Sequence, residues 1–318
     1  MGERILITGA SGFTGRYLSP LLRELGHEVI DWVSPRAAEA AAKAAMTDGA
    51  AHDTIARADV QAQTICADIR DPDAVREAVE QARADVVIHL AGATHPSSPD
   101  KTGMQDANVL GADNLLGALA QSKTPPRRVI VASSSHVYGE QPPGDLSEDR
   151  RPNPLSFYGC SKLSMEQLAQ GYAPHFEVLI ARPFNYTGHG QAEHFVVPKI
   201  VAHFRDRKPV LTMGATDKRR DFSDVRDVCD IYAKLIDAPM SGQSAVVNLT
   251  SGTVRSLSDV VTRCAAVSGH TLEVKTDPSL LRANDPDVIK ACTKQLESMI
   301  GEIPARPIDD TLRWMLEG

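Results

Sequence analysis

The sequence predicts an α/β fold in which helices cover both faces of a parallel sheet, followed by a smaller C-terminal lobe. Short apolar runs alternate with longer stretches in which apolar residues recur at helical spacing, a pattern typical of successive strand–helix–strand units. The runs Val86-Val87-Ile88 and Val129-Ile130-Val131 are apolar at every position, as expected for strands buried on both sides. After Arg182 the elements become shorter and richer in proline and glycine, which predicts the smaller lobe.

The strands and helices can be placed in order along the first 182 residues. Strands are predicted over residues 4–8, 28–33, 63–66, 85–90, 128–132 and 177–182. Apolar residues at helical spacing predict helices over residues 14–25, 73–83, 106–121 and 157–172. Residues 35–59 are rich in alanine, a strong helix former. They predict an additional exposed helix and loop, to which we assign no function.

Composition argues against several classes of protein. The formal net charge of −7 is unlike the basic excess of a nucleic-acid-binding protein. No apolar run reaches the roughly 20 residues of a membrane span, and no leader of the secretory type precedes the first strand. The five cysteines are scattered and lack C-x-x-C spacing, so neither a disulfide framework nor a metal site is expected. We therefore expect a cytoplasmic protein with reduced thiols.

A glycine-rich loop follows the first strand. It reads Gly9-Ala10-Ser11-Gly12-Phe13-Thr14-Gly15 and leads into a helix. Glycines let backbone N–H groups approach a pyrophosphate closely, and the helix N-terminus adds about half a positive charge. The loop therefore predicts a Rossmann-type dinucleotide site that includes Gly9, Ser11, Gly12, Phe13, Thr14 and Gly15. Asp68 and Ile69, after the third strand, are expected to flank the adenine, unless they only form a turn ahead of Pro72.

The end of the second strand bears on the choice between NAD and NADP. An acidic side chain there would bind the ribose 2′-hydroxyl, whereas arginine accommodates a 2′-phosphate. The predicted end, near Val33, is uncharged and is followed by Ser34 and Arg36, which favours NADP(H). If the strand ended two residues earlier, Asp31 would become the ribose ligand and NAD(H) would be favoured.

Tyr158 and Lys162 form a candidate acid–base pair. They are four residues apart on a predicted helix, so they share one face. A neighbouring ammonium stabilises a phenolate and brings the pKa of a tyrosine towards the working range. Tyr158 could then exchange a proton with a carbonyl oxygen while a nicotinamide exchanges a hydride with its carbon.

A cluster of hydroxyl groups follows the fifth strand. It consists of Ser133, Ser134 and Ser135 and is followed by His136, at the edge of the sheet where ligands of open α/β folds bind. One of these hydroxyls can orient the substrate oxygen opposite Tyr158. For His136, a structural role and a contact with the substrate both remain open.

Together these motifs resemble, in order and spacing, the extended short-chain dehydrogenases/reductases. The similarity includes His89-Leu90-Ala91-Gly92-Ala93 and covers essentially the whole chain. It implies Ser134 as the catalytic hydroxyl, Tyr158 as the acid/base, and Lys162 as its partner and ribose ligand. Leu90, Ala91 and Gly92 would line the cofactor site, and Asn108 falls where the family carries a structural asparagine.

Motifs beyond Arg182 resemble those of enzymes that act on GDP-mannose derivatives, namely 4,6-dehydratases and 4-keto-6-deoxy reductases. They begin at Arg182-Pro183-Phe184-Asn185 and at Lys218-Arg219-Arg220-Asp221, with a third at Arg282-Ala283-Asn284-Asp285-Pro286. The third departs from the expected pattern, since Ala283 replaces a proline. The resemblance implies that Asn185, Arg220 and Arg282 hold the nucleotide diphosphate, because a guanidinium offers a planar fork of donors. Arg219 is expected to be a solvated surface charge.

One position separates the possible reactions. The dehydratases that this chain resembles carry a glutamate two residues after the catalytic hydroxyl, whereas here that position is His136 and its neighbour is Ser135. We therefore expect reduction of the 4-keto group of a nucleotide-activated 6-deoxyhexose, with both residues near the substrate. A 4-epimerase with tightly bound NAD is the alternative within enzymes, and a non-catalytic dinucleotide sensor is the alternative outside them.

The resemblance also implies a domain organisation and an assembly. Residues 1–182 are expected to form the NADP-binding domain, with residues from about 224 to 250 returning to it, and residues 183–318 to form mainly the nucleotide-sugar lobe. A homodimer is expected through the helices at 106–121 and 157–172.

Overall fold

The computed structural model describes residues 2–47, 63–94, 99–281 and 286–318. The chain divides into two compact units. The first comprises residues 1–139, 152–182 and 232–247, and the second comprises residues 140–151, 183–231 and 248–318.

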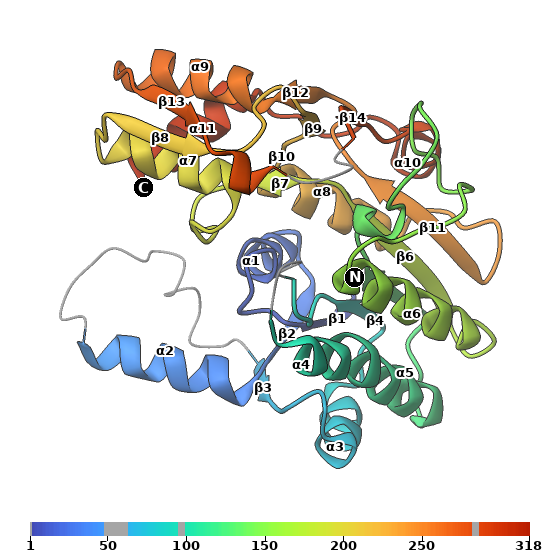
Figure 1. Ribbon diagram of the computed structural model, residues 1–318. Coiled ribbons are helices and arrows are strands. Elements are labelled where there is room, and N and C mark those ends of the chain that lie inside the picture. The colour runs from blue at the N-terminus through green and yellow to red at the C-terminus, as the bar shows by residue number, and fades with distance from the viewer. Residues whose placement is uncertain (1, 48–62, 95–98, 282–285) are drawn as a thin grey trace. The chain divides into compact units, whose positions relative to one another are not determined.

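The first unit is built on a seven-stranded sheet with the strand order β11-β6-β5-β4-β1-β2-β3 (Figure 1). The strands are β1 (Arg4–Thr8), β2 (Glu28–Val33), β3 (Gln63–Cys66), β4 (Val86–His89), β5 (Arg128–Ala132), β6 (Glu177–Pro183) and β11 (Ser244–Leu249). From β3 to β6 every neighbouring pair is parallel. The strand order reverses direction between β1 and β4, which is the feature that defines a doubly wound sheet. The predicted fold class is confirmed.

Helices follow the strands of this sheet. They are α1 (Gly15–Glu24), α2 (Pro35–Thr47), α3 (Pro72–Ala82), α4 (Lys101–Gln105), α5 (Gly111–Gln121), the short 3-10 helix η2 (Ser135–Val137), α6 (Phe157–Gly171) and α8 (Val225–Leu235), which runs into this unit from the second. Asp71 begins α3 by accepting hydrogen bonds from the backbone N–H groups of Asp73 and Ala74, and Ser156 caps α6 in the same way through Gly159. None of the helices in the described part of the chain has the length and hydrophobicity of a membrane span.

The helix predicted over residues 106–121 begins earlier and contains an irregular turn. It starts with α4 at Lys101, where Asp100 accepts a hydrogen bond from the N–H of Gly103. It then passes through a π-helical segment, η1 (Asp106–Leu110), before α5. The start at residue 106 was wrong because the polar first turn contributes no apolar periodicity.

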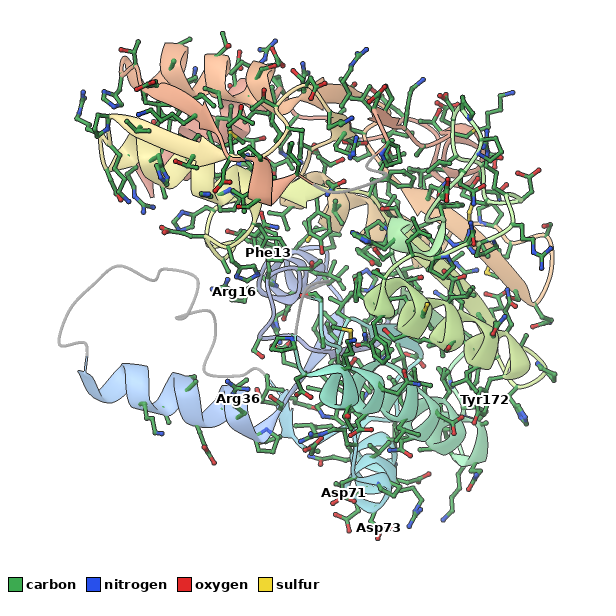
Figure 2. All side chains as sticks on the ribbon, viewed as in Figure 1. Phe13, Arg16, Arg36, Asp71, Asp73 and Tyr172 are labelled. Carbon is green, nitrogen blue, oxygen red and sulfur yellow. The ribbon has the colours of Figure 1, made fainter. Side chains whose placement is uncertain are left out.

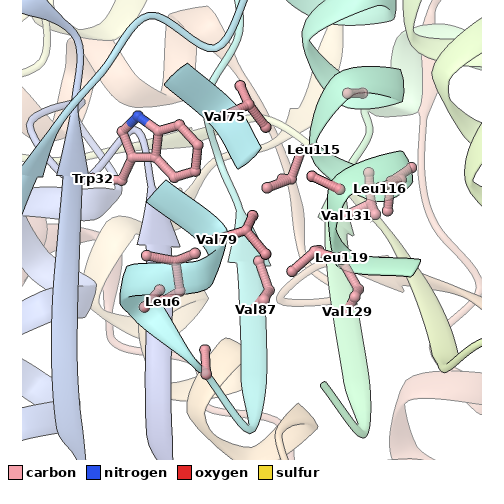
Figure 3. Close-up of a cluster of buried hydrophobic side chains, with 14 of the residues drawn as sticks. Leu6, Trp32, Val75, Val79, Val87, Leu115, Leu116, Leu119, Val129 and Val131 are labelled. Atoms are coloured by element: carbon pink, nitrogen blue, oxygen red, sulfur yellow. The ribbon is translucent and has the colours of Figure 1, made fainter. Parts of the chain in front are cut away.

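One face of the sheet packs on α3, α5 and α6 through a continuous apolar core (Figure 3). Leu6, Val87 and Val129 project from neighbouring strands towards helix residues such as Leu115. These four side chains are fully buried. Alternate residues of a strand share one face, so Thr8 and His89 continue this face towards the carboxyl ends of the strands.

The second unit has its own core. It contains β7 (Tyr186–Thr187), α7 (Val196–Arg205), β8 (Val210–Met213), β9 (Arg219–Asp221), β10 (Ser223–Asp224), β12 (Val254–Ser256), α9 (Leu257–Ser268), β13 (Glu273–Thr276), η3 (Pro278–Leu280), β14 (Val288–Ile289), α10 (Lys294–Ile300) and α11 (Ile308–Glu317). Phe204, Leu211, Val260 and Leu312 are at the centre of a buried cluster that joins α7, α9 and α11.

Shortening one core side chain should destabilise the first unit. Leu115 is fully buried, so Leu115→Ala should lower the free energy of unfolding by about 2–5 kcal/mol through lost burial and a residual cavity. Urea unfolding followed by circular dichroism measures the change. Leu25→Ala, at a position that is 57% exposed, is the matched control. Equal effects of the two substitutions would contradict the assignment of this core.

Candidate active site

The glycine loop between β1 and α1 has a shape that only glycine permits. Gly9 has a φ of +73°, and a Cβ there would lie 2.7 Å from the backbone nitrogen of Ala91. A Cβ on Gly15 would lie 2.5 Å from the carbonyl oxygen of Ala10. The loop therefore packs against the turn after β4, while Ser11 and Gly12 stay exposed. This cradle fits a pyrophosphate, which requires close backbone N–H groups at a helix N-terminus.

Strand β2 ends at Val33, and this boundary bears on the role of Asp31. The carboxylate of Asp31 accepts hydrogen bonds from the Ser19 hydroxyl at 2.6 Å and from the Arg23 guanidinium at 2.8 Å. It is therefore engaged with α1 and is not at the strand end, where a ribose ligand would lie. The residue that follows β2 is Ser34, whose hydroxyl accepts a hydrogen bond from the N–H of Ala37 in the first turn of α2.

Arg36 lies in the first turn of α2, next to the end of β2 (Figure 2). Its side chain is exposed. The end of β2 therefore presents a hydroxyl, a helix N-terminus and a guanidinium, and this combination favours an anionic ligand.

A pocket of about 390 Å³ lies after β3, lined by Asp68, Arg70, Asp71, Asp106 and Leu110. Arg70 donates hydrogen bonds to both carboxylate oxygens of Asp68, and this hydrogen bonding lowers the pKa of Asp68. The backbone carbonyl of the neighbouring Ile69 accepts a hydrogen bond from Asn114. Asp71 caps α3 (Figure 2), and Asp68 borders the pocket. The role of Asp68 and Ile69 beside an adenine stays a prediction.

Tyr158 and Lys162 lie one turn apart on α6, and both side chains are buried. The ammonium group of Lys162 donates a hydrogen bond of 2.8 Å to the carbonyl oxygen of Ala132, at the end of β5. Burial lowers the pKa of Lys162 to about 8, and the carboxylate of Glu166 opposes that shift. A lysine in this state holds a positive charge near neutral pH in a medium of low dielectric constant, where the charge acts strongly on a nearby phenol.

The segment from Ser134 to Val137 packs on α6 beside Tyr158. The hydroxyl of Ser134 accepts a hydrogen bond of 3.2 Å from the N–H of His136. The His136 ring meets the Tyr158 ring edge-on, with 5.5 Å between centroids. A Cβ on Gly159 would lie 2.6 Å from the carbonyl oxygen of His136, so segment and helix are in direct contact. The structure thus brings together Ser134, His136 and Tyr158, and the half-buried Ser135 lies in the same turn.

Asn108 joins the turn after β4 to the helix that carries Tyr158. It lies in the π-helical segment and is fully buried. Its side chain bonds the N–H and C=O of Ala93 at 2.8 and 3.1 Å and donates to the Ser161 hydroxyl at 3.0 Å. A π-helical turn changes the direction of the side chains that it carries, and here it places an amide between two parts of the candidate site.

His89 occupies the buried end of β4. One ring nitrogen, Nδ1, lies 2.7 Å from the Thr8 hydroxyl, and the other makes no hydrogen bond to the described residues. Burial, with a smaller contribution from the charge of Lys162, lowers the pKa of His89 to about 3. The imidazole is therefore neutral at physiological pH and adds no charge to the site.

Sequence reasoning missed a buried ion pair behind Lys162. Glu166, one turn further along α6, binds the guanidinium of Arg182 at 2.9 and 2.7 Å and accepts a hydrogen bond from the Ser133 hydroxyl. Of the clustered serines, Ser133 is thus engaged inside the protein. Helical spacing predicts only that Glu166, four residues after Lys162, shares its helix face; it does not indicate the partner Arg182.

The predicted substrate ligands lie in the second unit. Asn185 is exposed just before β7, and its carbonyl accepts a hydrogen bond from Ser223. Arg220 is half-buried on β9 and donates to the carbonyl oxygen of Arg219 at 2.8 Å. Arg282 lies outside the described residues. Next to Arg220, the buried carboxylate of Asp221 accepts hydrogen bonds from the side chains of Ser223, Thr250 and Ser251, which fixes this end of β9.

Residues 5–250 match the NAD dependent epimerase/dehydratase family. This match covers well over half of the 318 residues. The chain belongs to this family. The predicted assignment to the NAD(P)-dependent oxidoreductases of the extended short-chain type is thereby confirmed, and so is the α/β fold that it implied.

Several relatives of this chain carry names of enzymes that act on nucleotide sugars. The chain is 28% identical to GDP-6-deoxy-D-talose 4-dehydrogenase of Aggregatibacter actinomycetemcomitans, over 92% of this chain and 90% of the relative. It is 29% identical to GDP-6-deoxy-D-mannose reductase of Pseudomonas aeruginosa, over 99% of this chain and 97% of that relative. A UDP-glucose 4-epimerase of Corynebacterium glutamicum is 24% identical over 95% of this chain and 91% of its own length.

Solved structures of the same fold superpose along nearly the whole chain. A candidate epimerase from Burkholderia cenocepacia J2315 has a TM-score of 0.87 and 35% identity, covering 99% of this chain and 97% of its own. RMD from Pseudomonas aeruginosa complexed with NADPH has a TM-score of 0.81 and 27% identity, and the match covers 100% of this chain and 97% of RMD. MoeE5 in complex with UDP-glucuronic acid and NAD has a TM-score of 0.81 and 27% identity, and the match covers 98% of this chain and 97% of MoeE5.

Removing the buried ammonium should stabilise the protein in a pH-dependent way. Below about pH 8 the folded and unfolded chains both keep the Lys162 proton, and folding buries a charge. Between the folded pKa of about 8 and the ordinary value of 10.5 only the unfolded chain keeps the proton, so this cost disappears as the pH rises. Lys162→Met should therefore be more stable than wild type near neutral pH, by up to about 3 kcal/mol.

The gain should shrink as the pH approaches 10.5. Urea unfolding without added cofactor, at neutral and at alkaline pH, measures both values. Lys101→Met, at an exposed position of α4, is the control and should change little at either pH. A gain of the same size at both pH values would contradict the buried-charge explanation.

Proposed function

We propose that this protein reduces the 4-keto group of a nucleotide-activated 6-deoxyhexose, with GDP-4-keto-6-deoxy-D-mannose as the leading substrate. The observation that carries the proposal is His136 packed on Tyr158 beside Ser134. A dehydratase of the kind that this chain resembles would carry a glutamate at His136, to remove a proton during elimination. The site retains a proton donor and a hydroxyl for carbonyl reduction, whereas a histidine replaces that carboxylate.

The relatives support the same ketone. The sugars in two of their names, 6-deoxy-D-talose and 6-deoxy-D-mannose, differ only in configuration at C4. Oxidation of either sugar at C4 gives one and the same 4-ketone. A reductase that resembles both relatives would therefore start from that ketone, and its product would have one of the two configurations.

Each side chain has a defined role in this proposal. Tyr158 donates the proton to the oxygen at C4 as the alkoxide forms, and the charge of Lys162 favours the phenolate that is left. Ser134 donates a hydrogen bond that orients the carbonyl. A nicotinamide bound along the glycine loop would supply the hydride.

We assign the nucleotide diphosphate to the second unit. Asn185, Arg220 and Arg282 are its proposed ligands, with the two guanidinium groups binding phosphate oxygens. Dimerisation through α5 and α6 remains a prediction.

NADP(H) is the proposed cofactor in preference to NAD(H). Asp31 already binds Ser19 and Arg23, so it is engaged with α1 and is not available to hold a ribose 2′-hydroxyl. Ser34 and Arg36 occupy that end instead, and Arg36 is suited to a 2′-phosphate. RMD, which superposes with a TM-score of 0.81, was solved with NADPH.

The decisive assay supplies GDP-4-keto-6-deoxy-D-mannose, made in place by a separate 4,6-dehydratase, with NADPH or NADH. We expect NADPH to be consumed and a GDP-6-deoxyhexose to form, whose C4 configuration is then read by NMR. If folded protein consumes neither cofactor but releases NAD on denaturation, the 4-epimerase is supported instead. A sensor would bind the dinucleotide without turnover of any sugar nucleotide.

Removal of one hydroxyl should abolish most of this activity. Tyr158→Phe deletes the proton donor, so kcat should fall by about 10²–10⁴-fold while the thermal unfolding midpoint stays close to wild type. Tyr172→Phe is the matched control, because the Tyr172 hydroxyl binds Asp113 near the far end of α6. Full turnover by Tyr158→Phe would refute the assignment of the acid.

Cofactor selectivity should depend on Arg36. Arg36→Ala removes the charge proposed for the 2′-phosphate, so the KM for NADPH should rise by about 10–100-fold while the KM for NADH changes little. Asp31→Asn is the companion variant, and its KM for NADH should remain near that of wild type because Asp31 is engaged with α1. Equal losses with both cofactors in Arg36→Ala would argue against a 2′-phosphate contact.

A further inference from the structure

Three successive residues at the end of β5 have different partners, and two of those partners are on α6. The carbonyl oxygen of Ala132 accepts the hydrogen bond from Lys162. The hydroxyl of Ser133 donates to Glu166. Ser134 then presents the hydroxyl of the candidate site. The strand end that carries Ser134 is therefore fixed to α6 at the two residues that precede it.

Glu166 is itself held from a third element. Arg182, at the end of β6, donates to both of its carboxylate oxygens, and the two side chains are 4% and 3% exposed. The Arg182 guanidinium also lies over the Tyr138 ring, 4.8 Å from its centroid. A bidentate pair of this kind fixes geometry as well as charge. The carboxylate that binds Ser133 thus has one orientation.

A purely structural contact would not need these charges. Apolar side chains of similar volume often replace a buried ion pair without loss of stability. They could neither accept the Ser133 hydrogen bond nor place a negative charge one helical turn from Lys162. Among the described residues, the titratable groups near Lys162 are Tyr158 and Glu166 on α6 and the neutral His89 on β4, with Arg182 bound to Glu166 from β6. Among these, Glu166 supplies the negative charge that opposes the loss of the Lys162 proton.

We propose that Glu166, oriented by Arg182, is the positioning residue of this active site. Through Ser133 it fixes the end of β5 and so places Ser134 relative to Tyr158, and through its charge it keeps Lys162 protonated. It touches none of the reacting atoms. The part of this inference that concerns turnover rests on the proposed reductase function, whereas the part that concerns Lys162 does not.

Glu166→Gln keeps the shape of the side chain and removes its charge. Lysine labelled with ¹³C at Cε lets NMR follow the titration of Lys162 directly, with the resonance assigned by its absence in Lys162→Met. We expect the titration midpoint of Lys162 to fall by about one pH unit and kcat to fall by about 10–100-fold in the reductase assay. Ser133→Ala cuts only the link to β5, so it should lower kcat and leave the Lys162 midpoint in place.

Glu177→Gln is the matched control. Glu177 also pairs with a buried arginine, Arg128, across β5 and β6, but at the opposite ends of these strands. It should cost stability without moving either the Lys162 midpoint or kcat. An unchanged midpoint and unchanged turnover in folded Glu166→Gln would overturn the proposal.

The experiment also distinguishes a folding failure of Glu166→Gln from a failure of the proposed reductase function. If Glu166→Gln fails to fold, unchanged turnover in Ser133→Ala would by itself overturn the positional part. If wild type reduces no sugar nucleotide, the proposed function fails, and the Lys162 titration still decides whether Glu166 controls that charge.

Discussion

A charged ammonium group buried at the end of a strand sets the main constraint on this fold. Lys162 is 4% exposed, and burial of an unpaired charge costs several kcal/mol. The surrounding elements reduce that cost by supplying partners for the charge or by adding no second positive charge. The end of β5 supplies a carbonyl oxygen, α6 supplies a carboxylate at Glu166, and His89 remains uncharged. The same arrangement keeps a positive charge beside Tyr158, where a phenol can use it for proton transfer.

The topology of the sheet brings the glycine loop to the end of the sheet where this charge lies. The strand order reverses between β1 and β4, so the loops that leave these two strands diverge and leave room for a ligand. Gly9 allows the first loop to approach Ala91 closely, and Asn108 ties the second loop to α6. The glycine loop and the residues proposed for proton transfer are therefore parts of one packed framework within the first unit.

Strands β1 to β6 were predictable from short apolar runs between helical stretches, and their bounds agree with the structure to within one residue. The seventh strand of the sheet, β11, was not placed individually. The start of α4 was not predictable, since its first turn is polar. Tyr158 and Lys162 could be paired from helical spacing alone. The role of Glu166 could not be read with them, because a glutamate on a helix is usually solvated and its partner Arg182 lies 16 residues away. Only the packing of α6 on β6 brings the two side chains together.

The ion pair of Glu166 and Arg182 restricts how these two positions can diverge. Replacing either residue alone leaves an uncompensated charge in the interior, which is more damaging than replacing both with apolar residues. The single-substitution intermediates are therefore the least fit, and the two positions can drift only by a concerted change. A designer who alters the chemistry of this site would face the same barrier and would need to treat the two positions as one unit.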